Sequence, residues 1–269
     1  MVVFTDLDGT LLDAATYSFD AAAEALAALR GRGIPLVIVS SKTRAEIEPI
    51  QRRLGIADPF VVENGGAVFI QGECFAGLVP RAVGRDGYRV VELGLPYGEL
   101  RRALGELAAA SGVTVRGFGD MALEEIADRT GLPAAEAALA RRREYDEPFV
   151  FEGPPDRREA FLRHVEARGL RCTRGGRFHH LTGRHDKGEA CRLLTDGYRR
   201  AAAGAGLVTI GLGDSLNDRP MLEAVNIPLL VQRPDGSYDP ELRLPHLRYA
   251  QGVGPAGWNQ AVLTLLRGT

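Results

Sequence analysis

The chain has 269 residues, enough for one large domain or two smaller ones, and its 45% hydrophobic and 25% charged content favours a packed core over disorder. The formal net charge of −2, with no basic stripe, does not indicate a nucleic-acid partner. No apolar run approaches the roughly 20 residues that span a bilayer, and the N-terminus lacks the features of a signal peptide, so we expect a soluble, cytoplasmic protein with no membrane partner.

Short apolar strands alternate with helices in the first third of the sequence. Strands are predicted over residues 2–5, 34–39 and 60–62, and helices over 19–30 and about 40–54. The strands are continuous runs of β-branched and aromatic residues, which is typical of strands buried on both faces. This alternation predicts a parallel sheet with helices on both of its faces.

The pattern changes near residue 80 and returns at residue 186. The intervening segment mixes both element types: strands over 88–93, 113–118 and 149–151, helices over 97–111, 121–130, 133–143 and 155–168, and a hairpin over 170–181. Further on we expect helices over 186–203 and 220–224 and strands over 207–210 and 227–231. We therefore predict an α/β fold, a doubly wound and mostly parallel sheet from residues 1–82 and 184–269, with an α+β cap domain inserted at residues 83–183.

Two residue counts bear on function. Lysine and arginine total 33, but only Lys42 and Lys187 are lysines. A lysine is a compact point charge where arginine is a planar fork, so two retained lysines either serve a site or reflect chance in a biased composition. The three cysteines, Cys74, Cys172 and Cys191, are widely spaced and predict neither a disulfide framework nor a zinc site.

Polar clusters follow three of the predicted strands, at residues 6–10, 40–43 and 211–218. In an open parallel sheet such clusters meet at the carboxyl edge, where ligands bind. Carboxylates gathered there repel one another unless a cation offsets their charge. Mg²⁺ prefers oxygen ligands, and Asp6, Asp214 and a backbone carbonyl near Asp8 would suit it.

Three simpler interpretations of these clusters were weighed. Asp6 and Asp8 alone fit a solvated turn. A Ca²⁺ loop requires glycine at its sixth position and glutamate at its twelfth, where this chain has Leu11 and Tyr17, so that interpretation fails. Glycines at 211 and 213 are weak evidence for a nucleotide site, because the third glycine of that fingerprint is missing.

Taken together, these residues resemble the haloacid dehalogenase (HAD) superfamily. Its four motifs are matched in order by the Asp-Leu-Asp-Gly-Thr run at 6–10, by Ser40, by Lys187 and by the Gly-Asp-x-x-x-Asp run at 213–218. The place of the insertion is similar to that of the large cap in Cof-type sugar phosphatases. The resemblance covers the whole chain and implies a phosphomonoester hydrolase.

The resemblance also implies a role for each motif residue. Asp6 would attack phosphorus and form an aspartyl-phosphate, while Asp8 would protonate the leaving oxygen and then activate water. Ser40 and Lys187 would bind the phosphoryl oxygens. Mg²⁺ would be held by Asp6, Asp8 and Asp214. Supporting residues would be Thr10, Asn217 and Asp218; Thr10 equally fits a turn, and the other two fit helix capping.

Local signals point to a substrate class. The Ser-Ser-Lys-Thr run at 40–43 and the segment 175–181 resemble the mannosyl-3-phosphoglycerate phosphatases, which implies a phosphorylated glycoside as the small-molecule partner and mannosylglycerate, a compatible solute, as the product. Candidate substrate-binding residues are Ser41, Lys42, Glu63, Asn64, Gly65, Arg177, His179 and His180. Glu63 to Gly65 equally fit a tight turn, His179 and His180 equally fit hairpin alternation, and the arginines at 141–143 fit a solvated helix end.

Two other functions stay open at this point. One is a different capped sugar-phosphate phosphatase, or a phosphomannomutase-like enzyme that returns the phosphoryl group to its substrate. The other is a phospho-aspartate signalling domain, which also uses strand-end carboxylates, Mg²⁺ and a lysine. Such domains have no inserted cap, and a second aspartate at Asp8 favours turnover over storage. The sequence does not indicate an oligomeric state.

Overall fold

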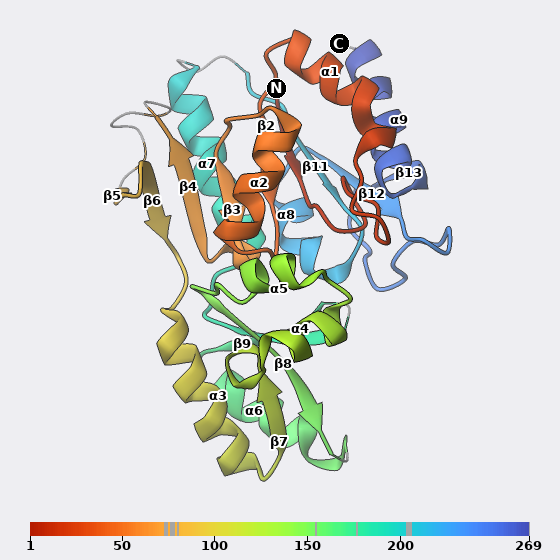
Figure 1. Cartoon of the computed structure of the whole chain (residues 1–269). Coiled ribbons are helices and arrows are strands. Elements are labelled where there is room, and N and C mark those ends of the chain that lie inside the picture. Colours follow the sequence, from red (N-terminus) through yellow and green to blue (C-terminus); the bar gives the residue numbers. More distant parts are fainter. Residues whose placement is uncertain are drawn as a thin grey trace.

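The structure is a computed structural model that describes residues 1–72, 75, 79, 81–153, 155–175, 177–202 and 206–268 (Figure 1). Its larger part, here called the core, is built on a nine-stranded sheet, and its smaller part, the cap, on a four-stranded sheet. Cys74 lies outside the described residues, whereas Cys172 and Cys191 are free thiols.

Six strands form the parallel part of the core sheet, in the spatial order β13-β12-β11-β1-β2-β3. They are β1 (Val2–Thr5), β2 (Leu36–Val39), β3 (Phe60–Val62), β11 (Thr209–Gly213), β12 (Ile227–Gln232) and β13 (Arg248–Val253). β1 lies at the centre and pairs with β2 on one side and β11 on the other. The predicted parallel sheet is therefore confirmed, and Asp6 follows a fully buried strand with a parallel neighbour on each side.

The sheet continues beyond β3 through three antiparallel strands, β4 (Ala67–Gln71), β6 (Tyr88–Glu92) and β5 (Val83–Arg85). Phe60 stacks on Phe69 with ring centroids 5.1 Å apart, and Tyr88 meets both rings edge-on. The cap boundary expected at residue 83 therefore falls inside the core sheet. The error arose because β5 is largely exposed and β6 is fully buried only at Val90 and Val91, unlike the continuous buried strands before them.

Helices cover both faces of the core sheet. On one face α1 (Ala23–Gly31), α2 (Arg44–Leu54) and α9 (Gly254–Arg267) pack against Val3 and Ile38. On the other, α7 (Lys187–Ala201) and α8 (Arg219–Glu223) pack against Val2 and Phe4. Short 3-10 turns complete the chain: η1 (Asp20–Ala22), η2 (Glu63–Gly65), η3 (Phe118–Asp120), η4 (Pro155–Arg157) and η5 (Leu216–Asp218).

Four core elements, β4, β5, β13 and α9, were not predicted from the sequence. The most consequential is α9, because it carries Trp258, a fully buried side chain whose Nε1 donates to Thr5 Oγ1 at 3.0 Å. Thr5 is the last residue of β1. The C-terminal helix thus supports the strand end from which Asp6 projects.

The cap sheet is antiparallel, in the order β7-β8-β10-β9. Its strands are β7 (Thr114–Gly117), β8 (Asp146–Glu152), β9 (Arg171–Gly175) and β10 (Phe178–Thr182). One face packs on α3 (Tyr97–Ser111) and α6 (Arg158–Ala167). The other packs on α4 (Leu123–Thr130) and α5 (Ala134–Ala140), and α5 lies against α2 of the core (Figure 1). None of the helices in the described part of the chain has the length and apolar character to cross a membrane.

Candidate active site

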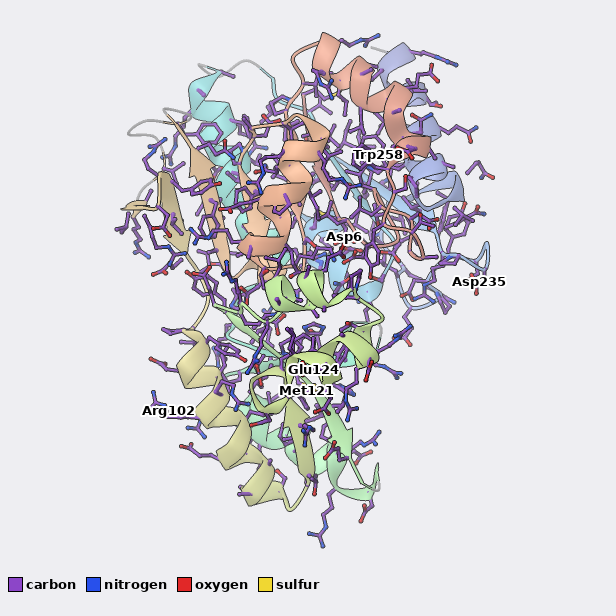
Figure 2. The ribbon with its side chains drawn as sticks, viewed as in Figure 1. Asp6, Arg102, Met121, Glu124, Asp235 and Trp258 are labelled. Carbon is purple, nitrogen blue, oxygen red and sulfur yellow. The ribbon has the colours of Figure 1, made fainter. Side chains whose placement is uncertain are left out.

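The carboxyl ends of β1, β2 and β11 meet at one edge of the core, as the sequence predicts, and Figure 2 shows Asp6 at this edge, facing the cap. Asp6 is only 6% exposed, and its backbone N–H donates to the carbonyl of Leu212 at 2.9 Å. Ser40 follows β2 and Asp214 follows β11. Three segments that are far apart in the sequence thereby place polar side chains at a single edge.

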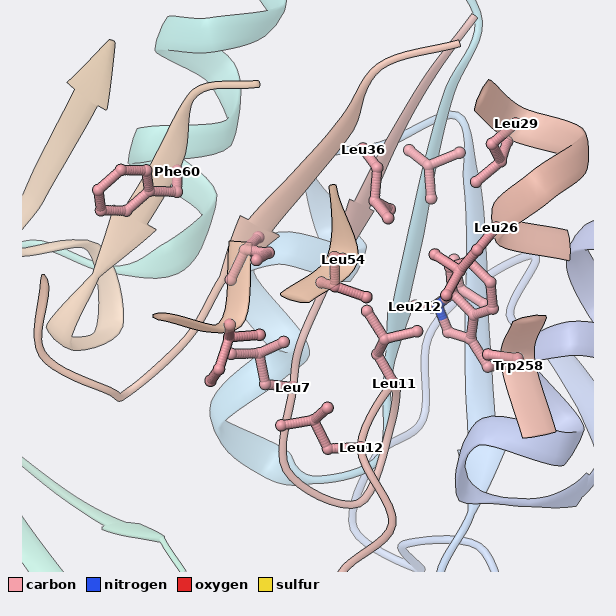
Figure 3. Packing of buried hydrophobic residues seen from close by; sticks show 14 of the residues in the cluster. Leu7, Leu11, Leu12, Leu26, Leu29, Leu36, Leu54, Phe60, Leu212 and Trp258 are labelled. Atoms are coloured by element: carbon pink, nitrogen blue, oxygen red, sulfur yellow. The ribbon is translucent and has the colours of Figure 1, made fainter. Parts of the chain in front are cut away.

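Leucine side chains anchor the loop after β1 in the hydrophobic core. Leu7, Leu11 and Leu12 are buried in the core cluster that also contains Trp258 (Figure 3). The backbone closes on itself, because Leu7 O accepts from the N–H of both Thr10 and Leu12. A loop that is polar in sequence is therefore rigid, and a rigid loop fixes the carboxylate that it carries.

Lys187 lies at the centre of the site. Its Nζ is 2.7 Å from Asp6 Oδ1 and 2.6 Å from Asp218 Oδ1, and its side chain is inaccessible to solvent. Burial alone would lower the pKa of this ammonium, but the two carboxylates outweigh it and raise the pKa above the ordinary lysine value. Lys187 therefore carries a positive charge beside Asp6, in a region that excludes water.

Asp218 positions this lysine. Its Oδ2 accepts from the backbone N–H of Asp214 at 3.0 Å and of Ser215 at 3.2 Å, while Oδ1 contacts Lys187. A Cβ on Gly213 would lie 2.5 Å from Asp218, so only glycine fits there. With both oxygens engaged, Asp218 acts on the site through Lys187 and through the backbone after β11.

Asp6, Asp214 and Asp218 bring carboxylate oxygens within 4.8 Å of one another, and because the oxygens of Asp218 are engaged, Asp6 and Asp214 are the two that can hold a metal ion. Burial and the neighbouring carboxylates raise the pKa of Asp6 well above its usual range and that of Asp214 to about 7. A divalent cation would relieve this repulsion, so the donor set fits Mg²⁺. Thr10 Oγ1 donates to Asp214 Oδ1 at 3.2 Å, which orients the carboxylate.

Asp8 is set apart from that cluster. Its side chain is 40% exposed, and its Oδ1 is 3.0 Å from Lys42 Nζ. The same ammonium is 3.7 Å from Glu46 and lies over the Tyr17 ring, 5.1 Å from its centroid. Asp8 is thus not a side-chain neighbour of Asp214, and a contribution of its backbone carbonyl to a metal stays a prediction.

The second motif forms a tight turn into α2. Ser40 is fully buried, and its Oγ accepts from the N–H of Lys42 at 3.2 Å. Thr43 caps the helix in a reciprocal pair with Glu46, and its hydroxyl also lies 3.1 Å from the carbonyl of Leu139 in the cap. The Ser41 carbonyl accepts from Arg143 of the cap at 2.7 Å. This turn therefore belongs both to the site and to the contact between core and cap.

Glu63, expected to contact a sugar, has a different environment. Its carboxylate is fully buried and accepts from the backbone N–H of Glu144 and of Tyr145 at 2.8–3.1 Å. Burial raises its pKa to about 8, although Arg143 opposes the shift. A carboxylate engaged in this way is unsuited to bind sugar hydroxyls, so we reassign Glu63 to joining the core to the cap. Gly65 likewise packs against backbone, since a Cβ would lie 2.2 Å from the carbonyl oxygen of Asp186.

Two of the three cap residues that were expected to contact the substrate, Arg177 and His179, have other partners. Arg177 is exposed and donates to the carbonyl of Arg129 at 3.0 Å, at the end of α4. His179 packs against Phe149 and Phe151 in the aromatic cluster of the cap. His179 departs from the expected substrate contact because alternation along β10 directs it to the opposite face from His180. Arg177 precedes β10, and its guanidinium is bound at the end of α4.

His180 does face the core. Its Nδ1 is 2.7 Å from Asp146 Oδ2, and Asn64 Nδ2 donates to the same oxygen at 3.3 Å. The side-chain amide of Asn217 is 3.5 Å from Asn64 Oδ1. Asn64 and Asn217, two of the predicted site residues, therefore link β10 of the cap to the loop that holds Asp218.

Sequence reasoning missed Asp146 and Arg143. Asp146 is fully buried, and His180 and Arg143 keep its pKa below the usual range against the effect of burial. Arg143 was expected at a solvated helix end, but its side chain is only 7% exposed. Nothing in the triple-arginine run distinguishes Arg143 from its neighbours, because its partners Ser41 and Asp146 are brought to it only by the fold.

Comparison with known proteins agrees with this arrangement. A profile of haloacid dehalogenase-like hydrolases matches residues 3–77. Over 98% of its length the chain is 45% identical to a glucosyl-3-phosphoglycerate/mannosyl-3-phosphoglycerate phosphatase of Methanococcoides burtonii, covering 97% of that protein. It is also 41% identical to the Persephonella marina protein of the same name, with 99% and 97% coverage. Identity to a mannosyl-3-phosphoglycerate phosphatase of Pyrococcus furiosus is 37%, with 86% and 90% coverage.

Solved structures share the fold across both parts. A Thermoplasma acidophilum protein matches with a TM-score of 0.65 at 18% identity, over 98% of this chain and 97% of the other. The sucrose-phosphatase of Synechocystis, solved with sucrose and phosphate, matches with a TM-score of 0.60 at 14% identity, over 98% and 97%. At this identity the likeness concerns the fold, core and cap together.

Proposed function

The chain belongs to the haloacid dehalogenase-like hydrolases, and we propose that it is a Mg²⁺-dependent phosphatase that hydrolyses glucosyl-3-phosphoglycerate and mannosyl-3-phosphoglycerate. The products are the corresponding glycosylglycerate and inorganic phosphate. One observation carries the proposal: a buried carboxylate, Asp6, is held 2.7 Å from a buried ammonium, Lys187, at the carboxyl edge of the sheet. A nucleophile beside a fixed positive charge is what phosphoryl transfer requires.

The reaction proceeds in two displacements. Asp6 attacks phosphorus, the bond from phosphorus to the leaving oxygen breaks, and Asp8 gives that oxygen a proton. Water then attacks the aspartyl-phosphate, Asp8 takes a proton from it, and the Asp6 carboxylate is regenerated as phosphate leaves.

The remaining residues of the site stabilise the phosphoryl group during its transfer and orient the substrate. Lys187 and the hydroxyl of Ser40 bind phosphoryl oxygens on which charge accumulates, and Asp218 fixes the lysine for this task. When bound, Mg²⁺ would be held by Asp6 and Asp214 and would neutralise charge on the phosphoryl group. Ser41, Asn64 and His180 are the proposed contacts for the rest of the substrate.

The choice of substrate is supported by the relatives. The relatives at 45% and 41% identity carry names that join the glucosyl and mannosyl compounds, whereas the Pyrococcus furiosus protein at 37% is named for the mannosyl compound alone. We therefore extend the expected mannosyl specificity to both sugars. A signalling domain accounts for neither the cap nor the second carboxylate at Asp8.

A phosphate-release screen with Mg²⁺ tests the proposal. We expect the wild-type protein to hydrolyse both glycosyl phosphoglycerates with kcat/KM at least about 10²-fold above mannose 6-phosphate or glucose 6-phosphate. Equal rates on all four compounds would leave a phosphatase but remove the proposed specificity. Release of phosphate only in the presence of a sugar bisphosphate would instead indicate a mutase.

A further inference from the structure

Lys42 has surroundings that its place in the second motif does not explain. Its ammonium lies between the carboxylates of Asp8 and Glu46, over the Tyr17 ring, with only 11% of the side chain exposed. Asp8 is 40% exposed and Glu46 only 10%. Glu46 is also bound to Thr43 as part of the helix cap, whereas the Asp8 carboxylate is partly open to solvent.

The chemistry of Asp8 brings Lys42 close to the leaving group. To protonate the leaving oxygen, its carboxyl group must come within about 3 Å of that oxygen. Because Lys42 Nζ is 3.0 Å from Asp8 Oδ1, the ammonium then lies within roughly 6 Å of the leaving oxygen. Whatever the leaving group carries close to that oxygen is therefore presented to Lys42.

A phosphoglycerate carries a carboxylate at that distance. Two carbons separate its phosphorylated oxygen from the carboxyl carbon, so the carboxylate oxygens lie about 3–5 Å from the leaving oxygen. This span fits the space between the leaving oxygen and Lys42. Glucose 6-phosphate and mannose 6-phosphate have no charged group at that distance.

We infer that Lys42 recognises the carboxylate of the glycerate leaving group while it stays paired with Asp8. The ammonium keeps a carboxylate partner with and without substrate, so a buried charge is never left unpaired. This inference deepens the proposed function, on which it rests, by identifying a residue that selects the glycerate side of the substrate.

A neighbouring buried cation is less suited to this task. The guanidinium of Arg143 donates to the carbonyls of Ser41 and Ala140, so its donors are engaged in joining cap to core. Lys187 is fully buried between Asp6 and Asp218 and serves the phosphoryl group. Lys42 is the lysine whose partner is solvent-accessible and catalytic.

The test combines a protein change with a substrate change. Lys42→Met removes the charge and keeps a similar chain length. It is measured on glucosyl-3-phosphoglycerate and on its alcohol analogue, in which CH₂OH replaces the carboxylate. The pair 3-phosphoglycerate and glycerol 3-phosphate repeats the contrast without the sugar. Arg199→Met removes a charge from an exposed position on α7 and is the matched control.

We expect wild type and Arg199→Met to favour the carboxylate member of each pair by about 10²-fold in kcat/KM, and Lys42→Met to retain less than about tenfold preference. The fall in kcat/KM should be at least about tenfold larger on the carboxylate substrates than on the alcohols, so the ratio between the members of a pair is the readout. Activity on the alcohols also reports that the variant is folded. Lys42→Met/Glu46→Gln, which keeps the helix cap and removes the second buried charge, should give the same result.

Three outcomes overturn the inference: an undiminished preference in Lys42→Met, an equal loss on both members of a pair, or no preference in the wild type. Failure of the proposed function has a different signature. In that case the wild type hydrolyses neither glycosyl phosphoglycerate, while the unglycosylated pair still reports whether Lys42 discriminates a carboxylate.

Discussion

At the scale of single residues, the site is a set of buried charges with assigned partners. The two lysines of this arginine-rich chain each pair with one carboxylate of the first motif, Lys187 with Asp6 and Lys42 with Asp8. Composition left the role of Lys187 open, and the resemblance to the third motif of the superfamily predicted that it serves the site. Glu63 was predicted to contact the substrate, and this prediction was wrong. Its actual partners are backbone N–H groups of the cap, more than eighty positions further along the chain, and no local pattern indicates them.

The raised pKa of Glu63 predicts a pH dependence of stability. Its pKa is about 8 in the folded protein against an ordinary value of 4.5, so between these values the folded state keeps a proton that the unfolded chain has released. The free energy of unfolding should therefore fall as the pH rises through this window, by about 2–4 kcal/mol, and level off above it.

Glu63→Gln should remove this component, since the amide does not titrate but still offers an acceptor to the cap backbone. Chemical unfolding near pH 5.5 and near pH 9 should show a smaller difference in the variant than in the wild type, by about 2–4 kcal/mol. Glu99→Gln, at an exposed position on α3, is the control. An unchanged difference in Glu63→Gln would show that Glu63 is charged across the whole range.

At the scale of elements, the site depends on how segment ends are anchored. The turn η2 packs against the start of α7, whose N-cap is Asp186 and whose first residue is Lys187. Strands whose sequences are continuous apolar runs, such as β1 and β2, could be predicted, because burial on both faces of the sheet requires apolar residues at every position. β11 was predicted over 207–210 but spans Thr209–Gly213. β13 could not be predicted, because it mixes exposed polar residues with glycine and resembles a loop.

Gly65→Ala tests the contact between η2 and α7. Gly65 has φ of +100°, and a Cβ there would lie 2.2 Å from the carbonyl oxygen of Asp186. We expect a loss of more than about 3 kcal/mol in the free energy of unfolding, and at least about a tenfold fall in kcat, because the displaced helix start carries Lys187.

The control is Gly55→Ala, at a C-cap with φ of +64°, where the nearest atom is the flexible end of Arg30 at 3.8 Å. It carries the strain of a positive φ without the backbone clash and should cost about 1–2 kcal/mol with kcat unchanged. Equal unfolding free energies and equal kcat values for the two variants would contradict the proposed contact.

At the scale of the whole molecule, the cap closes over the carboxyl edge of the core through groups that also shape the site. Arg143 donates to Ser41, the Thr43 hydroxyl contacts Leu139, and Glu63 holds the cap backbone. The sequence predicted an inserted cap and the edge at which the motifs meet. It did not predict these contacts, because each joins residues that are distant in the chain and have no local pattern.

The central claim is that Asp6 becomes phosphorylated and that Asp8 then serves its dephosphorylation. Asp8→Ala with p-nitrophenyl phosphate tests it most directly, because this leaving group needs little protonation, whereas attack by water still needs a base. The expected result is one equivalent of p-nitrophenolate released in a burst, followed by slow turnover, with the phosphoryl group located on Asp6 by peptide mass spectrometry after acid quenching. Steady release without a burst, or a phosphoryl group on any other residue, would contradict the account.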